Sequence, residues 1–258
     1  MYQAEDDIIK PMSDYRVLAV DETGKASMNH KSTTFVLSGL ITSEIFLPKL
    51  HEDFCALKTK FFNDSDVVFH CRDMLRKKGP FAILRIPEKE KAFWDEFVLL
   101  LDHADITMAT IVVDKIKAKA LGWNDIAILR KAYSKLLEEF TKKHLTNSRK
   151  GKIIAESDPY QDKYLLEAHN RLQGLGVPSE GITGAEYRNK MTSVSLVNKL
   201  NLDINVQLAD NLAIMGYVFY ELKINKRTKL SSTEERFRQL IDRKIANISN
   251  PAIFEVLV

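Results

Sequence analysis

The chain has 258 residues, 45% of them apolar, and its 38 basic and 35 acidic side chains leave a formal charge of only +3. This composition is enough for a substantial core and excludes a disordered protein, whereas the charge neither requires nor excludes a nucleic-acid partner. We expect a cytoplasmic protein without membrane contact, because no signal peptide or long apolar run is present. Cys55 and Cys71 lack CxxC spacing, which argues against structural zinc and favours a reduced compartment, with a disulfide left open.

Residues 1–14 are expected to form a loose leader, and residues 15–258 a single domain. The domain begins with a strand over Tyr15–Val20, which is followed by Asp21, Glu22 and the turn residue Gly24. Neighbouring strand side chains point to opposite faces of a sheet, so one of the two acids points inward. Asp21 has the parity of the apolar Ala19, and we therefore expect it to be the inward one.

Strands and helices alternate along the rest of the chain, which predicts an α/β fold. Apolar and β-branched runs predict strands at Thr33–Ile41, Val67–Phe69, Ile106–Val113, Lys152–Ala155 and Glu180–Tyr187, the first of these forming a hairpin with Tyr15–Val20. Apolar residues at helical spacing predict helices at Ser43–Phe62, Pro87–Asp105, Lys131–His144, Tyr160–Leu172, Val206–Leu222 and Ser231–Ala246. The many cations between Lys142 and Lys152 are typical of a solvated helix end, with a phosphate contact as the alternative.

Asp210 is the most informative single residue, because it lies in the middle of the apolar helix Val206–Leu222. Burial of an unpaired carboxylate costs several kcal/mol, so this acid needs a metal, a cation or a network of donors. A Lys or Arg of the helix Ser231–Ala246 would serve as well as a metal.

Three carboxylates thus lie at strand ends or on a buried helix face: Asp21, Glu156 after the strand Lys152–Ala155, and Asp210. Mg²⁺ and Mn²⁺ prefer such oxygen ligands and retain waters for substrate phosphates. A pair of these ions would activate water and stabilise the leaving oxygen of a phosphodiester. Each strand-end acid taken alone is more typical of an ordinary turn.

The order and spacing of six segments resemble the DUF3800 family: LAVDETG, FVLSGLI, VFHCRDM, TIVVDK, IIAESDPYQDKYLL and VQLADNLAIMGYVFYE. Together they span most of the chain, from about Tyr15 to Glu221. The resemblance implies a ribonuclease H-like fold with a mixed central sheet flanked by helices. It also implies a metal-dependent nuclease or a related phosphotransferase.

Carried over to this chain, the resemblance assigns Mg²⁺ or Mn²⁺ ligands to Asp21, with Glu22 beside it, and to Glu156 and Asp210. The histidine of the family falls on His70, and a glutamine before the late acid falls on Gln207. Many relatives have an acid two residues before the histidine, where this chain has Val68. A fourth ligand would then come from the remaining acids: Glu22, Asp73, Asp158 or Asp162.

Two further residues, His70 and Lys115, have two interpretations each. His70 is either a general acid or an ordinary hydrogen-bonded histidine, and Lys115 either contacts a phosphate or ends a strand at the solvent edge. Gln207 is taken with Lys115 as a substrate-binding residue. The expected function is hydrolysis of nucleic-acid phosphodiesters with Asp21, Glu156, Asp210 and His70 as catalytic groups. The alternative is a degenerate, non-catalytic nucleic-acid-binding or interaction module, as in phage defence or a mobile element.

Overall fold

In the computed structural model, the described residues are 15–146, 149–198, 202–246 and 252–258. The expected leader, residues 1–14, lies outside them. The strands form one sheet of order β5-β4-β1-β2-β3-β6, in which β2 runs antiparallel to β1 and β3. Their bounds are β1 (Tyr15–Gly24), β2 (Thr34–Ser43), β3 (Ile106–Asp114), β4 (Lys150–Glu156), β5 (Met191–Val197) and β6 (Ile253–Leu257). The predicted α/β class and the β1–β2 hairpin are confirmed.

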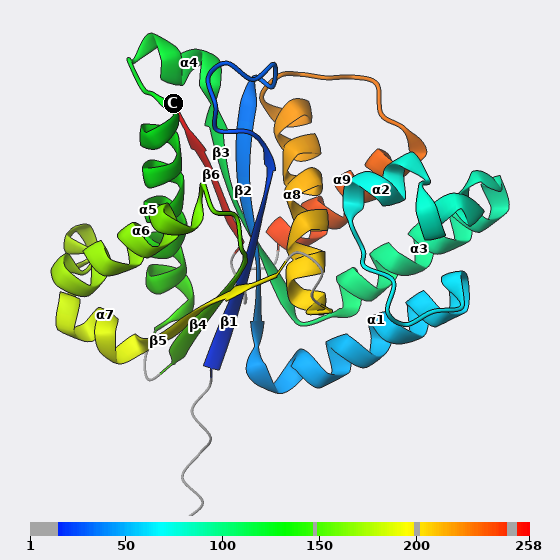
Figure 1. Cartoon of the computed structure of the whole chain (residues 1–258), viewed down its shortest axis with the longest axis horizontal. Coiled ribbons are helices and arrows are strands. Elements are labelled where there is room, and N and C mark those ends of the chain that lie inside the picture. The colour runs from blue at the N-terminus through cyan, green and yellow to red at the C-terminus, as the bar shows by residue number, and fades with distance from the viewer. Residues whose placement is uncertain (1–14, 147–148, 199–201, 247–251) are drawn as a thin grey trace, which may run out of the picture.

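Helices cover both faces of this mixed sheet (Figure 1). One face packs on α5 (Asp125–His144), α6 (Asp162–Leu175) and α7 (Gly184–Lys190). The other packs on α1 (Leu47–Phe62), α3 (Pro87–His103), α8 (Ile204–Lys223) and α9 (Ser232–Ile245). The remaining helical pieces are short: η1 (Glu44–Phe46), α2 (Cys71–Arg76), η2 (Gly79–Arg85), α4 (Lys115–Ala120) and η3 (Pro178–Glu180). Within the described ranges, no helix combines the length and apolarity needed to cross a bilayer.

The side chains of β1 alternate between the two faces of the sheet and pack in two separate cores. Leu18 and Val20 pack with α5 and α6, whereas Ala19 packs with α8 on the opposite face. α8 lies close against the sheet because Gly216 has no side chain; a Cβ there would lie 2.7 Å from the Thr110 Cγ2 atom. The buried helix predicted around Asp210 is therefore confirmed, and it covers the face to which Asp21 belongs.

Two predicted strands are wrong. Val67–Phe69 is an irregular extended segment, because the Phe69 N–H donates to the side chain of Gln207 instead of to a neighbouring strand. Glu180–Tyr187 contains η3 and the start of α7, where Thr183 and Glu186 form a capping box. The strands β5 and β6 were not predicted. The helix beginning at Ser231 is confirmed with its own capping box to Glu234.

Candidate active site

Asp21 and Glu156 lie at the same end of the sheet, because β1 and β4 run parallel and are neighbours. Asp21 is the seventh residue of β1, so the strand extends past it and does not end at Val20 as predicted. The Asp21 Oδ1 atom accepts a hydrogen bond of 2.7 Å from the Glu22 N–H, and the residue is 9% exposed. Asp21 therefore occupies the inward position that its parity predicts.

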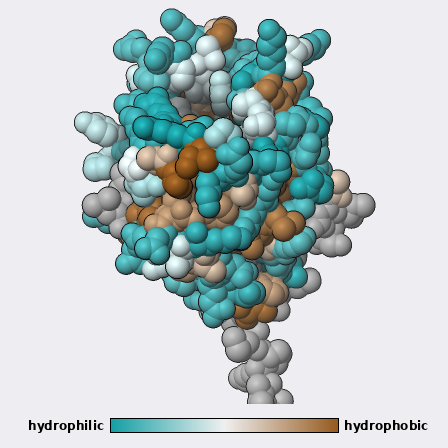
Figure 2. Space-filling model, turned by 90° about the vertical axis from the view of Figure 1, so that its right-hand side faces the viewer, coloured by the Kyte–Doolittle hydropathy of each residue, from teal (hydrophilic) through white to brown (hydrophobic). Residues whose placement is uncertain are grey.

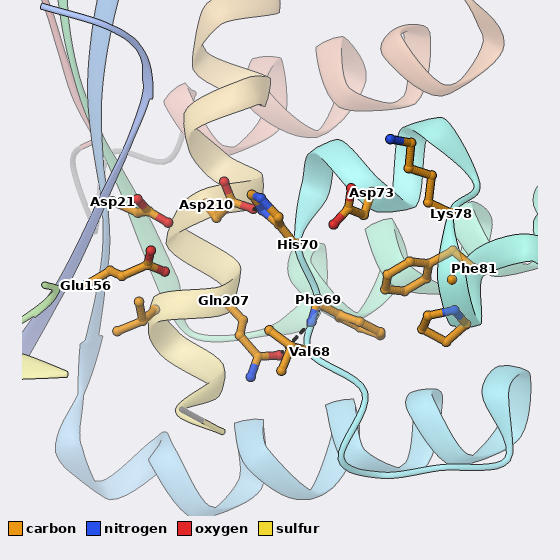
Figure 3. A pocket seen from close by; sticks show the side chains of 13 residues that line it. Asp21, Val68, Phe69, His70, Asp73, Lys78, Phe81, Glu156, Gln207 and Asp210 are labelled. Atoms are coloured by element: carbon orange, nitrogen blue, oxygen red, sulfur yellow. Dashed lines mark hydrogen bonds and ion pairs between the residues drawn. The ribbon is translucent and has the colours of Figure 1, made fainter. Parts of the chain in front are cut away.

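A cavity of about 430 Å³ separates this end of the sheet from the segment before α2. Figure 3 shows Asp21 and Glu156 projecting from the sheet toward α8, where Asp210 lies next to His70. The opposite wall is mostly apolar and comes from the loop and η2: Val68, Phe69, Pro80 and Phe81. Asp73, Lys78, Gly79, Val206 and Gln207 complete the lining. The three carboxylates predicted to act together thus line one cavity.

Asp210 has a network of donors, one of the three kinds of partner that its burial requires. Its Oδ2 atom lies 2.8 Å from the His70 Nδ1 atom and accepts a 2.7 Å hydrogen bond from the Cys71 N–H. Among the described residues, no Lys or Arg of α9 pairs with it, so the cation expected from that helix is not its partner. An ionised carboxylate accepts, which makes Nδ1 of His70 the donor and fixes the orientation of the ring.

Polar side chains of α8 form hydrogen bonds with the backbone of the segment Val68–Cys71. The Gln207 Oε1 atom accepts from the Phe69 N–H at 3.0 Å and from the Lys58 Nζ at 2.9 Å, and the Asn211 Nδ2 donates to the Phe69 carbonyl. Gln207, Asp210 and Asn211 share one face of α8, because they are spaced three and four residues apart. Gln207 therefore holds the wall in which His70 sits, in addition to lining the cavity.

Several carboxylates lie close enough to Asp21 to repel its negative charge. Burial raises the pKa of the Asp21 carboxyl well above its usual range, and repulsion from Glu22, Asp210 and Glu156 raises it further. Like charges held this close are relieved by a proton or by a bound cation. No group of three or more His, Cys, Asp and Glu side chains in the described ranges is arranged to hold a metal ion. Carboxylate oxygens are the donors that Mg²⁺ and Mn²⁺ prefer, but the carboxylates placed here are not gathered into a ligand group.

Glu22 and Lys115 are not brought to this cavity. Glu22 faces the other side of the sheet, lines a second cavity there, and accepts a 2.6 Å hydrogen bond from the Gln161 Nε2. The buried Lys115 ammonium donates to the carbonyls of Lys25 and Ser27 at 3.0 and 2.6 Å, which fixes the loop between β1 and β2. Lys115 is therefore neither exposed at the solvent edge nor placed at the cavity where it could contact a phosphate.

The four acids considered as a fourth ligand do not all lie at this cavity. Asp73 lines the cavity, and so does Val68. Asp158 borders the second cavity together with Glu22, while Asp162 accepts from the Ser157 hydroxyl and the Asp158 N–H. The wall from Lys78 to Phe81 was not predicted as part of the site, although a Pro just inside a short helical turn is a recognisable start signal.

Comparison with known proteins adds no family assignment. A scan against protein-family models finds none that matches this chain, and a search of curated proteins finds no match. The case for a function therefore depends on the geometry of the cavity and on the residues that line it.

Proposed function

We propose that the protein is a metal-dependent phosphodiester hydrolase that acts on nucleic acid, with its centre at Asp21, Glu156 and Asp210. One observation carries the proposal: three carboxylates from β1, β4 and α8 line a single cavity, where burial, and then repulsion from Glu22, Asp210 and Glu156, raises the pKa of Asp21. Retaining such repulsion costs stability, and a bound divalent cation would remove that cost. The mixed sheet with helices on both faces is compatible with the ribonuclease H-like fold and the DUF3800 family that the sequence resembles.

Asp21 and Glu156 would hold Mg²⁺ or Mn²⁺, with Asp210 or Asp73 adding oxygen donors from the facing wall. The ion would supply an activated water and charge stabilisation at the phosphate. Asp210 orients His70 through Nδ1, and the His70 side chain remains 41% exposed. His70 would then protonate the leaving oxygen as a general acid through its other ring nitrogen. Gln207 would act by positioning the wall around Phe69.

A cytoplasmic location belongs to the same proposal. Both Cys55 and Cys71 are free thiols, which is typical of a reducing compartment.

The test is cleavage of labelled single- and double-stranded DNA and RNA with Mg²⁺, Mn²⁺ or a chelator. We expect cleavage that requires the ion and that is lost in both Asp21→Asn and Glu156→Gln. The variants must keep the wild-type melting temperature for the comparison to count. Cleavage that survives the chelator, or that survives in both variants, would refute the proposal.

The second candidate is a binding module without catalysis on the same fold. It is favoured by Val68 at the cavity and by the two hydrogen bonds that already engage the Asp210 Oδ2 atom. Nucleic-acid binding without cleavage under every ion would select this candidate.

A further inference from the structure

One short segment beside the cavity carries a strong excess of positive charge. We define the α2–η2 segment as Cys71–Ile86, with the sequence CRDMLRKKGPFAILRI. It contains one acid, Asp73, and five cations: Arg72, Arg76, Lys77, Lys78 and Arg85. The whole chain has a formal charge of only +3, so this segment is far more basic than the average of the molecule.

Among the residues that the structure describes, four of these five cations have no carboxylate partner. Lys77 pairs with Glu90 at 2.7 Å, whereas within the described ranges Arg72, Arg76, Lys78 and Arg85 form no ion pair, and all four are exposed. Cations elsewhere on the surface are commonly paired, including those of the basic stretch near α5, where Lys142 binds Glu180 and Lys152 binds Glu44. Unpaired like charges repel one another, so the fold gains nothing from gathering them here.

The basic segment is continuous with the candidate active site. Lys78 and Phe81 of the segment line the cavity that contains Asp21 and Asp210, and α2 begins directly after His70. Figure 2 looks onto the side of the molecule that carries α1, α2 and α3, where several hydrophobic patches lie among a mostly hydrophilic surface. An acidic cavity suited to a metal ion is therefore bordered by a surface suited to anions.

We infer that the α2–η2 segment is the surface that binds the phosphate backbone of a polynucleotide and leads the strand into the cavity. This inference rests on the proposed function. Arg72 and Arg76 are one helical turn apart, about 6 Å along the axis, and a nucleic-acid strand carries a charge about every 3.4 Å. Four exposed cations within one short segment exceed what a single phosphate group would engage, which favours a polymer over a mononucleotide.

A membrane surface is the other anionic partner to consider, and the segment fits it less well. Its exposed large apolar side chains are Leu75, Ile83 and Ile86, which are 37%, 36% and 46% exposed and do not form a long continuous stripe on one helix. Interfacial helices need a long apolar face, and α2 has six residues.

The experiment measures binding of a fluorescent single-stranded oligonucleotide of about 20 bases, without divalent ions, between about 50 and 200 mM salt. The test variant combines Arg72→Ala, Arg76→Ala and Arg85→Ala. A matched control loses the same charge from paired cations elsewhere, through Lys49→Ala, Lys60→Ala and Lys91→Ala. We expect the test variant to bind more than about tenfold more weakly and its salt slope to fall by about 2, while the control stays near wild type.

Several results would overturn the inference: equal affinity of the test variant and the wild type, an equal loss in the control, or tighter binding of the wild type to phosphatidylserine vesicles than to the oligonucleotide. Melting temperatures identify a variant that fails to fold, and single substitutions then replace the triple one. Binding that depends on Arg72 and its neighbours without any metal-dependent cleavage would support the inference and refute the hydrolase. Metal-dependent cleavage with unchanged binding in the test variant would do the reverse.

Discussion

Asp21 and Glu22 are adjacent in one strand, yet their carboxylates lie on opposite faces of the sheet and in different environments. Glu22 accepts a hydrogen bond from Gln161, and beside it Asp162 accepts from Ser157 and Asp158. Asp21 faces a cavity lined by three more carboxylates, Asp73, Glu156 and Asp210, and its pKa is raised by burial and by repulsion from Glu22, Asp210 and Glu156. The Glu22 carboxylate has a side-chain donor within the protein, whereas the repulsion at Asp21 is relieved by a proton or by a bound cation. Unrelieved charge, more than the mere presence of acids, therefore distinguishes a candidate site from a structural network.

The largest effect expected from this contrast is the loss of catalysis in Asp21→Asn. The amide keeps the size of the carboxyl but removes the charge that would hold a cation. We expect cleavage to fall by more than about 100-fold, since even outer-shell changes at metal sites cost about 10- to 100-fold. The melting temperature should remain equal or rise, because one of the repelling carboxylates is gone. Activity is measured under single-turnover conditions.

The second effect is on stability and concerns the Glu22 side of the sheet. Lys115→Met removes the ammonium that binds the carbonyls of Lys25 and Ser27. Hydrogen bonds to charged groups contribute about 1.5–3 kcal/mol net. The cost of burying the ammonium, which lowers the pKa of Lys115, offsets part of this, so we expect a loss of about 2–3 kcal/mol in the free energy of unfolding. Urea denaturation measures it. Cleavage per folded molecule should stay unchanged. A large fall in cleavage would support the role of Lys115 as a substrate-binding residue.

A smaller effect is the pH dependence of stability that comes from Asp21. Its pKa is raised in the folded protein, so between the unfolded and the folded pKa the native state binds more protons than the unfolded state. Its contribution to stability is therefore complete below the unfolded value and is lost as the pH rises through the folded value. Compared at the same pH without metal, wild type should lose stability relative to Asp21→Asn as the pH rises. A stability difference between the two proteins that is constant with pH would show that folding does not raise the pKa of Asp21.

The smallest effect is expected for Glu22→Gln, which keeps an oxygen acceptor for the Gln161 amide. Cleavage should stay within about threefold of wild type, since surface-type substitutions that preserve their contacts are usually near neutral. The same assay as for Asp21→Asn applies. A loss as large as that of Asp21→Asn would place Glu22 among the metal ligands and would erase the contrast between the two faces.

The central elements could be predicted from the sequence because they are buried and uniformly apolar. β2 and β3 are buried runs of mostly apolar and β-branched residues, and α8 has only a few polar residues on its buried face. Edge strands such as β5 carry a weaker signal, since most of its residues are exposed. Val67–Phe69 has the composition of a strand, but its backbone hydrogen bond goes to a side chain of α8, which composition does not reveal.

The candidate site was predictable only in part, for the same reason. The inward position of Asp21 follows from the strand period, and the need of Asp210 for a partner follows from the apolar helix around it. The identity of that partner does not follow, because His70 and the Cys71 N–H come from a segment about 140 residues away. The exposed cations of the α2–η2 segment are visible in the sequence, but their position beside the cavity is not.

The most direct test of the central claim is calorimetric titration of Mn²⁺ into the wild type and into the Asp21→Asn, Asp210→Asn double variant. The account predicts saturable binding in the wild type that disappears in the double variant, with both proteins folded. Equal binding in the two proteins would contradict the claim that these carboxylates form a metal site.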